Sequence, residues 1–425
     1  MSSSLPKALT QRFEVLDSAH PFHTTRQQAL QDLKTRGLPT LKDEAYRYTP
    51  VTSLLTTHLT AEQPIETTPE ATSPVYYLDM DAYHVVLLNG QVSSEYTQWG
   101  GHEQFMRALT FKEAYQQQSH VFLAHFAQHA QSKADAFIAL NTTLFEEGLF
   151  IQITEDAILN KPLILYYCTT SSGHQPVTYP RLLVSAGKHS QASIVISWQT
   201  IGFTNAVAEV ILQKNARMDY YTLQTHLDPR SCQVNTIQYY QAQHSILNTY
   251  TFTWSGKMVR NNLSSMIDAS YSETNLYGLY CLDGQQHVDN CTTVDHSKPH
   301  TYSNELYKGI MTGESTGIFN GRIYVRPGAQ KTNALQTNNN LVLSNHATLH
   351  TKPQLEIWAD DVKCSHGATT GQLDEEQLFY LRTRGLQEDT ARHLLQQAFA
   401  SEVIDKIPLV ALRTHLYNNL LAQVS

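Results

Sequence analysis

The sequence has few charged residues and no long apolar run, and both absences narrow what the chain can be. Charged side chains make up 16% of its 425 residues and hydrophobic ones 41%, which is typical of a folded globular protein. The longest apolar runs, at 85–88 and 163–165, are far shorter than the roughly 20 residues that span a bilayer. The formal net charge of -8 lacks the basic excess that binds nucleic acid or anionic lipid. We therefore expect neither a membrane protein nor a nucleic-acid-binding protein.

Signals for secretion and for disulfide bonding are also missing. The first residues lack the charged and apolar regions of a secretory signal, and Glu14 and Asp17 follow soon after. The five cysteines, at 168, 232, 281, 291 and 364, are too widely spaced for a disulfide framework or a CxxC zinc site. We therefore expect a cytoplasmic protein with reduced thiols.

Several short catalytic motifs are absent from the chain. It has no GxxxxGKS/T phosphate-binding loop, so we expect no ATP hydrolysis by that mechanism. It also lacks HExxH, GxSxG and a GxGxxG that follows a strand, which are common signatures of zinc proteases, α/β-hydrolases and dinucleotide enzymes. We therefore predict a non-catalytic protein and assign no catalytic residue.

Hydrophobic patterning divides the chain into three units. Residues 1–148 are predicted to form a mixed, largely helical domain with a polar linker near 60–74. Residues 149–372 form a β-rich core, and residues 373–425 form a helical domain. Asp374 begins that last unit as the cap of a predicted helix, because a carboxylate there accepts from free backbone N–H groups.

The predicted core consists of short β-branched or aromatic runs separated by Gly, Asn, Pro and Asp. A small residue followed by a hydrophobic run recurs imperfectly at 191–195, 215–218, 244–247 and 346–349. This recurrence favours a β-helical solenoid, although a β-sandwich is nearly as well supported by the pattern alone. Gly313, Gly317 and Gly321 lie in a polar segment and are interpreted as turn glycines.

A cysteine and a histidine lie two residues apart in the run ADDVKCSHGA at 359–368. If residues 362–366 are extended, Cys364 and His366 point to the same face, because side chains alternate along a strand. A thiolate and an imidazole suit iron, zinc or copper(I), but two ligands do not complete a site and no third is evident. Taken alone, such a pair is more often a packed thiol and a hydrogen-bonded imidazole, and that interpretation leads at this point.

The second C-terminal helix is predicted to carry an apolar stripe. Its residues Ala391, Leu394, Leu395, Ala398 and Phe399 fall at i, i+3, i+4, i+7 and i+8. Such a stripe packs internally or binds a partner, and the pattern does not choose between the two.

Several runs of residues match the signature of a known family. In the last third they are HSKPHT at 296–301, LYKGI at 306–310, FNG at 319–321, AQKT at 329–332 and KPQLEIWADDVKCSHGA at 352–368. Near the start they are GLPT at 37–40, KDE at 42–44 and RYT at 47–49, with Tyr46 where tryptophan is common. Together they resemble the SufB/SufD family of SUF iron–sulfur cluster assembly proteins. The Cys-Ser-His-Gly run resembles its SufD branch, since SufB usually lacks that cysteine.

The resemblance implies a right-handed parallel β-helix flanked by N-terminal and C-terminal helical regions. It implies a scaffold that assembles with the paralogue SufB and the ATPase SufC, with SufC supplying ATP hydrolysis. His366, with Cys364 as a second candidate metal ligand, would lie at the SufB interface, where a transient iron–sulfur cluster or iron is built or passed on. The chain alone would hold no cofactor stably, and without SufB it could form a homodimer.

SufC is expected on the C-terminal helices. The resemblance places it on residues 385–425, and the apolar stripe offers Leu394, Leu395 and Phe399 for this contact.

Two other functions stay open from the sequence. One is a purely structural adaptor with no metal contact. The other is a carbohydrate-active β-helix enzyme, which would need a cluster of carboxylates on one face of the solenoid. The adjacent acidic residues at 360–361 and 374–376 support it poorly, because the second group is explained by helix capping.

Overall fold

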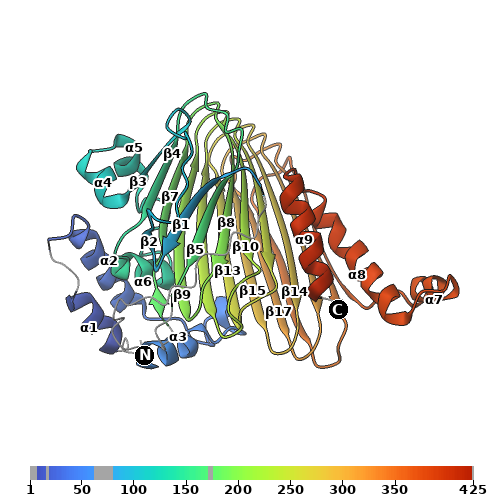
Figure 1. The fold of residues 1–425 in the computed structure, drawn as a ribbon. Helices are drawn as coiled ribbons and strands as arrows, with labels where there is room; N and C mark the ends of the chain where they lie inside the picture. The colour runs from blue at the N-terminus through green and yellow to red at the C-terminus, as the bar shows by residue number, and fades with distance from the viewer. Residues whose placement is uncertain (1–6, 16–18, 62–79, 171–175, 424–425) are drawn as a thin grey trace.

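The computed structural model describes residues 7–15, 19–61, 80–170 and 176–423, and its centre is a long solenoid of two facing β-sheets (Figure 1). In sheet A the strand order is β2 (Gln91–Val92), β1 (Tyr83–Leu88), β5 (Leu163–Cys168), β8 (Gln191–Gln199), β10 (Arg217–Gln224), β12 (Ile246–Thr253), β14 (Glu273–Leu282), β16 (Tyr302–Met311), β18 (Asn333–Val342) and β20 (Lys363–Gly371). In sheet B it is β19 (Thr348–Ile357), β17 (Thr316–Val325), β15 (His287–His296), β13 (Met258–Ile267), β11 (Cys232–Gln241), β9 (Phe203–Leu212), β7 (Arg181–Ala186), β4 (Leu149–Ile153) and β3 (Met106–Thr110), and β6 (Val177–Thr178) pairs with β9.

The connections between the strands define a parallel β-solenoid. From β7 onward, successive strands alternate between the two sheets, and each pairs in parallel with the next strand of its own sheet. Strands β1 and β3, which precede residue 149, also join these sheets. The solenoid prediction is confirmed, and the β-sandwich alternative is wrong, because a sandwich pairs its strands mainly in antiparallel fashion.

Alternation of side chains along each strand builds the solenoid interior. Apolar residues such as Ile194, Leu276 and Phe319 form one continuous core between the sheets. Amides also lie inside and bond to one another, as where Gln224 Nε2 donates to Gln233 Oε1 at 2.8 Å. Because strands of one sheet pair in register, each inward position stacks on the same position of the next turn.

The corners that lead into sheet A repeat one backbone turn. A residue with positive φ lies two positions before each of five strands, β10 to β18: Asn215, His244, Tyr271, His300 and Lys331. The rings of His244, Tyr271 and His300 stack in a column with centroid separations of 5.1 and 5.0 Å. The small residue that follows each of them is buried, as at Ser245 and Ser272. This repeated corner underlies part of the recurrence seen in the sequence.

Glycines serve two different purposes in the later turns. Gly313 has a φ of +59° in the turn after β16, so its interpretation as a turn glycine is confirmed. That interpretation is wrong for Gly317 and Gly321, which lie inside β17. A Cβ on Gly321 would lie 2.8 Å from Gln336 Cδ and 2.7 Å from Phe319 Cζ. At Gly321 the interior has room only for a hydrogen atom.

The N-terminal helices cover the outer face of sheet B (Figure 1). They are α1 (Lys7–Val15), α2 (His23–Arg36), the 3-10 helix η1 (Glu44–Tyr46), α3 (Val51–Ala61), α4 (Phe111–Gln116), α5 (His120–His125) and α6 (Ala136–Leu144). Apolar side chains such as Phe137 pack on Phe203 and Val234 of the sheet. Helix α3 ends at Ala61, and the rest of the predicted linker near 60–74 lies outside the described residues.

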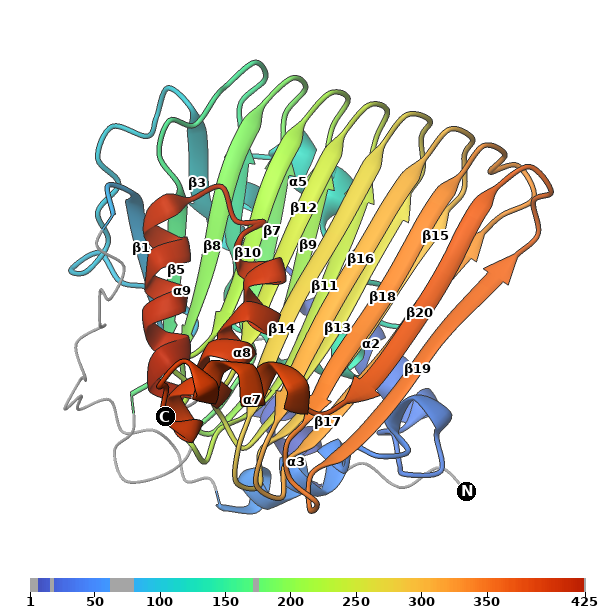
Figure 2. The ribbon, with the colours of Figure 1, turned by 90° about the vertical axis from the view of Figure 1, so that its right-hand side faces the viewer.

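The C-terminal helices are α7 (Glu375–Thr383), α8 (Glu388–Ile404) and α9 (Val410–Gln423). Helices α8 and α9 lie on the outer face of sheet A, and α7 extends away from the sheet (Figure 1, Figure 2). The predicted cap of α7 is confirmed: Asp374 Oδ1 accepts from the backbone N–H groups of Glu376 and Gln377 at 2.9 and 3.2 Å. Helices α8 and α9 bury apolar residues such as Val403 and Leu416 against sheet A. No helix in the described parts of the chain is long and apolar enough to cross a membrane.

Candidate functional site

The two ends of the solenoid differ, and we call the end formed by β19 and β20 the open end. At its start, each sheet ends in a short antiparallel strand: β2 pairs with β1, and β3 pairs with β4. At the far end, β19 and β20 are the last strands, and each has one edge without a partner strand among the described residues (Figure 2). Helices α8 and α9 lie on the face of sheet A and leave these edges uncovered. Such edges offer backbone donors and acceptors to another strand.

Both predicted site residues lie on β20, at this open end. Cys364 pairs in register with Ala334, and His366 pairs with Gln336. Ala334 and Gln336 are buried and face the interior, so Cys364 and His366 share the inward face, as their spacing predicts. Cys364 packs half-buried against the interior core, and this burial raises the pKa of its thiol. His366 is exposed.

The two residues supply only part of a metal site. Within the described ranges, no three His, Cys, Asp or Glu side chains are grouped so that they could hold a metal ion. An imidazole and a thiolate are both ligands for iron. Any ion held by His366 and Cys364 would therefore take its remaining ligands from outside this chain.

The other cysteines are packed in the protein, and none of the five forms a disulfide. Cys168, Cys232 and Cys281 are buried. Burial raises the pKa of Cys168 and Cys281 to about 12 and that of Cys232 to about 11. These thiols stay protonated at neutral pH and are poor candidates for metal ligands.

A row of polar side chains leads from the interior to His366. Glu305, Gln336 and His366 are register neighbours on β16, β18 and β20. Gln336 Nε2 donates a hydrogen bond to Glu305 Oε2 at 2.6 Å, and both side chains are buried. Burial raises the pKa of Glu305 to about 7, although the nearby side chains of Thr292 and Gln336 act to lower it.

Glu305 and Gln336 are not identifiable as site residues from the sequence. They lie 31 positions apart, in stretches that read as ordinary strands. The signal that would find them is the register between turns, because Gln336 and His366 occupy the same position on neighbouring strands. That register depends on corner lengths that the imperfect repeat does not define.

The predicted docking stripe on α8 is divided between two roles. Leu395 and Phe399 are partly buried against the core on sheet A. Lys308 of β16 donates to the Phe399 carbonyl at 2.9 Å, and its Nζ lies 4.1 Å from the centroid of the Phe399 ring. These two residues therefore hold α8 on the solenoid.

Other apolar side chains of the C-terminal helices remain exposed. Leu394 of α8 is 42% exposed, and Phe379 and Tyr380 of α7 are 69% and 57% exposed. We call these three residues the α7–α8 patch. Unlike Leu395 and Phe399, they are free to contact a partner protein.

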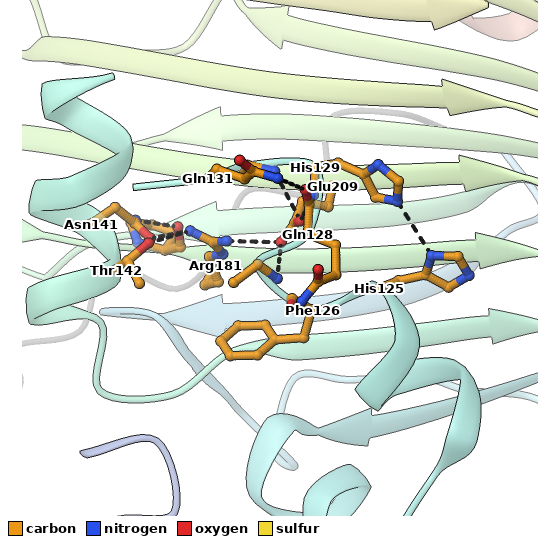
Figure 3. A network of polar contacts seen from close by, with 12 residues as sticks. His125, Phe126, Gln128, His129, Gln131, Asn141, Thr142, Arg181 and Glu209 are labelled. Atoms are coloured by element: carbon orange, nitrogen blue, oxygen red, sulfur yellow. Dashed lines mark hydrogen bonds and ion pairs between the residues drawn. The ribbon is translucent and has the colours of Figure 1, made fainter. Parts of the chain in front are cut away.

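A second buried carboxylate lies near the start of the solenoid, on the outer face of sheet B (Figure 3). Glu209 of β9 forms an ion pair with Arg181 of β7, with 2.8 Å between Nη2 and Oε2. The backbone N–H groups of Ala127, His129 and Ala130 each donate to Glu209 at 3.0 Å. Both carboxylate oxygens are thereby paired, and the loop after α5 is fixed to the sheet.

Two family models match the chain. The model described as SUF system FeS cluster assembly, SufBD core domain, matches residues 167–399. The model described as SufBD protein N-terminal region matches residues 10–165.

Three relatives are similar over most of their length. An iron–sulfur cluster assembly SufBD family protein of Synechocystis sp. is 31% identical over 405 residues, which cover 92% of this chain and 88% of that protein. The iron–sulfur cluster assembly protein SufD of Escherichia coli is 28% identical over 390 residues, 90% of this chain and 88% of its own length. The Arabidopsis thaliana protein ABCI7, chloroplastic, is 28% identical over 423 residues, which cover 95% of this chain and 86% of that protein.

Proposed function

Since the chain belongs to the SufBD family of SUF iron–sulfur cluster assembly proteins, we propose that it is a SufD-type scaffold that completes a cluster-assembly site with SufB. The observation that carries the proposal is the open solenoid end, where His366 is exposed between two free strand edges. The iron–sulfur cluster is the cargo of this site, and the chain acts in the cytoplasm as a non-catalytic subunit.

The free edges of β19 and β20 are the proposed contact with SufB. A partner strand added to an edge satisfies its backbone groups, and this is a common mode of protein association. Pairing at this end would place the partner next to His366 and Cys364 on the inward face. In the absence of SufB, a second copy of this chain would pair at the same edges and form a homodimer.

The imidazole of His366 is the better placed of the two candidate ligands. It is exposed at the open end, whereas Cys364 is half-buried and the pKa of its thiol is raised by burial. A thiol becomes a good iron ligand only when it loses its proton. We therefore assign the larger share of cluster binding to His366 and treat Cys364 as a ligand only if the partner lowers its pKa.

ATP hydrolysis in this assembly belongs to SufC. The chain has no phosphate-binding loop, and the α7–α8 patch contains most of the exposed large apolar side chains of the C-terminal helices. We place SufC on this patch, with Leu394 as the stripe residue that makes contact. Leu395 and Phe399 support that surface from beneath.

The test replaces single residues in a strain that depends on this chain for cluster assembly. His366→Ala should lower cluster formation by about tenfold or more, because a lost metal-site group has effects of this order. The complex should stay assembled, since one side chain contributes little to a large interface. His346→Ala removes another exposed histidine before β19 and is the matched control. Leu394→Asp, assayed by co-purification, should release SufC and retain SufB.

The outcomes separate the remaining alternatives. Normal cluster formation by an intact His366→Ala complex would replace the shared-site proposal with that of a structural adaptor without metal contact. Cys364→Ser should do less harm than His366→Ala if the cysteine mainly packs, and equal harm if it is a ligand. Family membership argues against the carbohydrate-active enzyme, for which no carboxylate cluster was evident in the sequence.

A further inference from the structure

The interior row that ends at His366 contains two buried oxygens whose hydrogen bonding is incomplete. Oε1 of Glu305 and Oε1 of Gln336 have no partner of good hydrogen-bond geometry in the described part of the chain. The Thr292 side chain lies on the sheet B side of Glu305 and favours its charged form, yet the Gln336 oxygen is left without a donor. A buried oxygen without a donor is costly, so in native proteins it usually has a partner or a function.

The amides of the next two interior rows are paired by contrast. Asn338 Oδ1 accepts from Asn340 Nδ2 at 2.7 Å and from Thr351 Oγ1 at 2.9 Å. Asn340 Oδ1 accepts from the Tyr280 hydroxyl at 2.5 Å. The vacant acceptor on Gln336 is therefore not shared by the other two inward amides of β18, although Asn320 Oδ1 of β17 also lacks a donor among the described residues.

The position of Glu305 determines which way the Gln336 amide points. Its Nε2 donates to Glu305 on the β16 side, and the amide oxygen, on the other branch of the group, is turned away from β16. Neighbouring strands lie about 4.8 Å apart, and the register neighbour of Gln336 on its other side is His366. A Cβ at Gly321 would collide with this amide, so the glycine gives the amide its space.

We propose that Glu305 and Gln336 are positioning residues for His366, an inference that rests on the proposed role of His366 at the SufB interface. Gln336 Oε1 accepts the N–H of one imidazole nitrogen, and the lone pair then resides on the other nitrogen. That second nitrogen points away from Gln336 and toward the open end, where a metal ion can meet it. Histidines that bind metals are commonly fixed by a hydrogen bond on their other nitrogen.

The test measures the protonation pattern of the His366 ring in the full chain. Ring nitrogen shifts are recorded at pH 8 on protein labelled with nitrogen-15 histidine, and the His366 signal is assigned by its loss in His366→Ala. In the wild type, one neutral tautomer should exceed the other by about tenfold, as expected for one hydrogen bond to a buried acceptor. In Gln336→Met, which keeps the volume but removes the acceptor, the two tautomers should be nearly equal. An unchanged ratio, or an equal mixture in the wild type, overturns the proposal.

Two further variants keep this test decisive. Gln233→Met makes the same exchange in a buried glutamine far from His366 and should leave the His366 signal unchanged. Glu305→Gln replaces the carboxylate by an amide that tolerates either orientation of Gln336, so the tautomer preference should fall to a few-fold. If Gln336→Met does not fold, Glu305→Gln decides, and an unchanged ratio there overturns the proposal.

The assembly assay then distinguishes this inference from the function on which it rests. Gln336→Met should lower cluster formation several-fold when His366 is present and have no further effect in a His366→Ala background. A harmless His366→Ala would reject the proposed function, and the tautomer measurement would still test the positioning of the ring. Equal losses in both backgrounds would reject the positioning role alone.

Discussion

Glu209 and Glu305 are both buried carboxylates, 0% and 1% exposed, and they are held in opposite ways. Glu209 lies on the outer face of sheet B, where the Arg181 guanidinium and three backbone N–H groups pair both of its oxygens. Glu305 lies in the interior near the open end, with an amide on one oxygen and no cation beside it. A satisfied carboxylate fixes structure, whereas an incompletely paired one marks a place where a further partner is expected.

The same difference separates the two ends of the solenoid. Near the start, the sheets end in the short antiparallel strands β2 and β3, of two and five residues, and helices cover the outer face of sheet B. At the far end, backbone edges, His366 and the Gln336 oxygen all remain available. The Glu209 network near the start therefore fixes structure, whereas the far end is the part of the solenoid that we propose for contact with SufB.

The largest expected effect comes from breaking the Glu209 network. Arg181→Met should lower the free energy of unfolding by about 3–5 kcal/mol, because it leaves a buried charge without its cation. Urea unfolding at pH 8 measures this loss. Arg230→Met is the control: it removes an exposed guanidinium, 2.9 Å from Asp228, and should change little. Similar losses in both variants would contradict the structural role of the Glu209 network.

A smaller effect is expected from Glu305, and its sign depends on pH. Burial favours the neutral form, so Glu305 binds a proton in the native state that the unfolded chain has already released. The stability of the native state that depends on this proton is fully present below the pKa of the unfolded chain, about 4.5, and is lost as the pH rises to about 7. Glu305→Gln removes this dependence. As the pH rises from 5 to 8, the free energy of unfolding of Glu305→Gln should increase by about 2–3 kcal/mol relative to that of the wild type.

Urea unfolding of both proteins at the two pH values checks this prediction. The comparison with wild type cancels groups that titrate alike in both. The groups that face Glu305 are Thr292, Gln336 and Tyr307, and the pKa of Tyr307 is itself raised by burial and by the Glu305 charge. Parallel pH profiles would show that Glu305 is not the neutral, buried group described here.

The smallest expected effect tests the space around Gln336. Gly321→Ala should lower the free energy of unfolding by about 1–2 kcal/mol, because the new methyl group would overlap Gln336 and Phe319. Gly367→Ala places a methyl group on β20 where no atom lies within 4 Å, and it should be nearly neutral. Thermal or urea unfolding compares the two. A neutral Gly321→Ala would mean that the interior row has more freedom than the structure shows.

Local signals predict a β-rich core because they repeat, whereas the choice of a solenoid over a β-sandwich depends on the family resemblance. Short β-branched runs and the small residue at each corner indicate repeated strands and corners, and Asp374 identifies the start of α7 from capping chemistry alone. Gly317 and Gly321 could not be placed correctly, since a glycine in a polar run reads as a turn. These positions need glycine because the side chains of Tyr280, Met311 and Gln336 fill the space that a Cβ would occupy, and only the tertiary structure reveals this.

Only two of the four residues of the candidate site could be predicted from the sequence, for a related reason. His366 and Cys364 are neighbours in the sequence, so strand alternation places them on one face. Glu305 and Gln336 join them only through pairing between turns, which no local pattern specifies. Likewise, the apolar stripe on α8 does not reveal that Phe399 packs on Lys308 while Leu394 stays exposed.

The attachment of α8 to strand β16 has a mechanical consequence. Lys308, which donates to the Phe399 carbonyl, lies on β16, and β16 is separated from β20 by β18 alone. Two strand spacings amount to about 10 Å, bridged throughout by backbone hydrogen bonds along the solenoid axis. A sheet is stiff along that direction, since lengthening it must stretch every hydrogen bond in a row at once. A displacement of α8 along the solenoid axis would therefore move His366 by nearly the same distance, because the last two turns form a short, rigid connection between them.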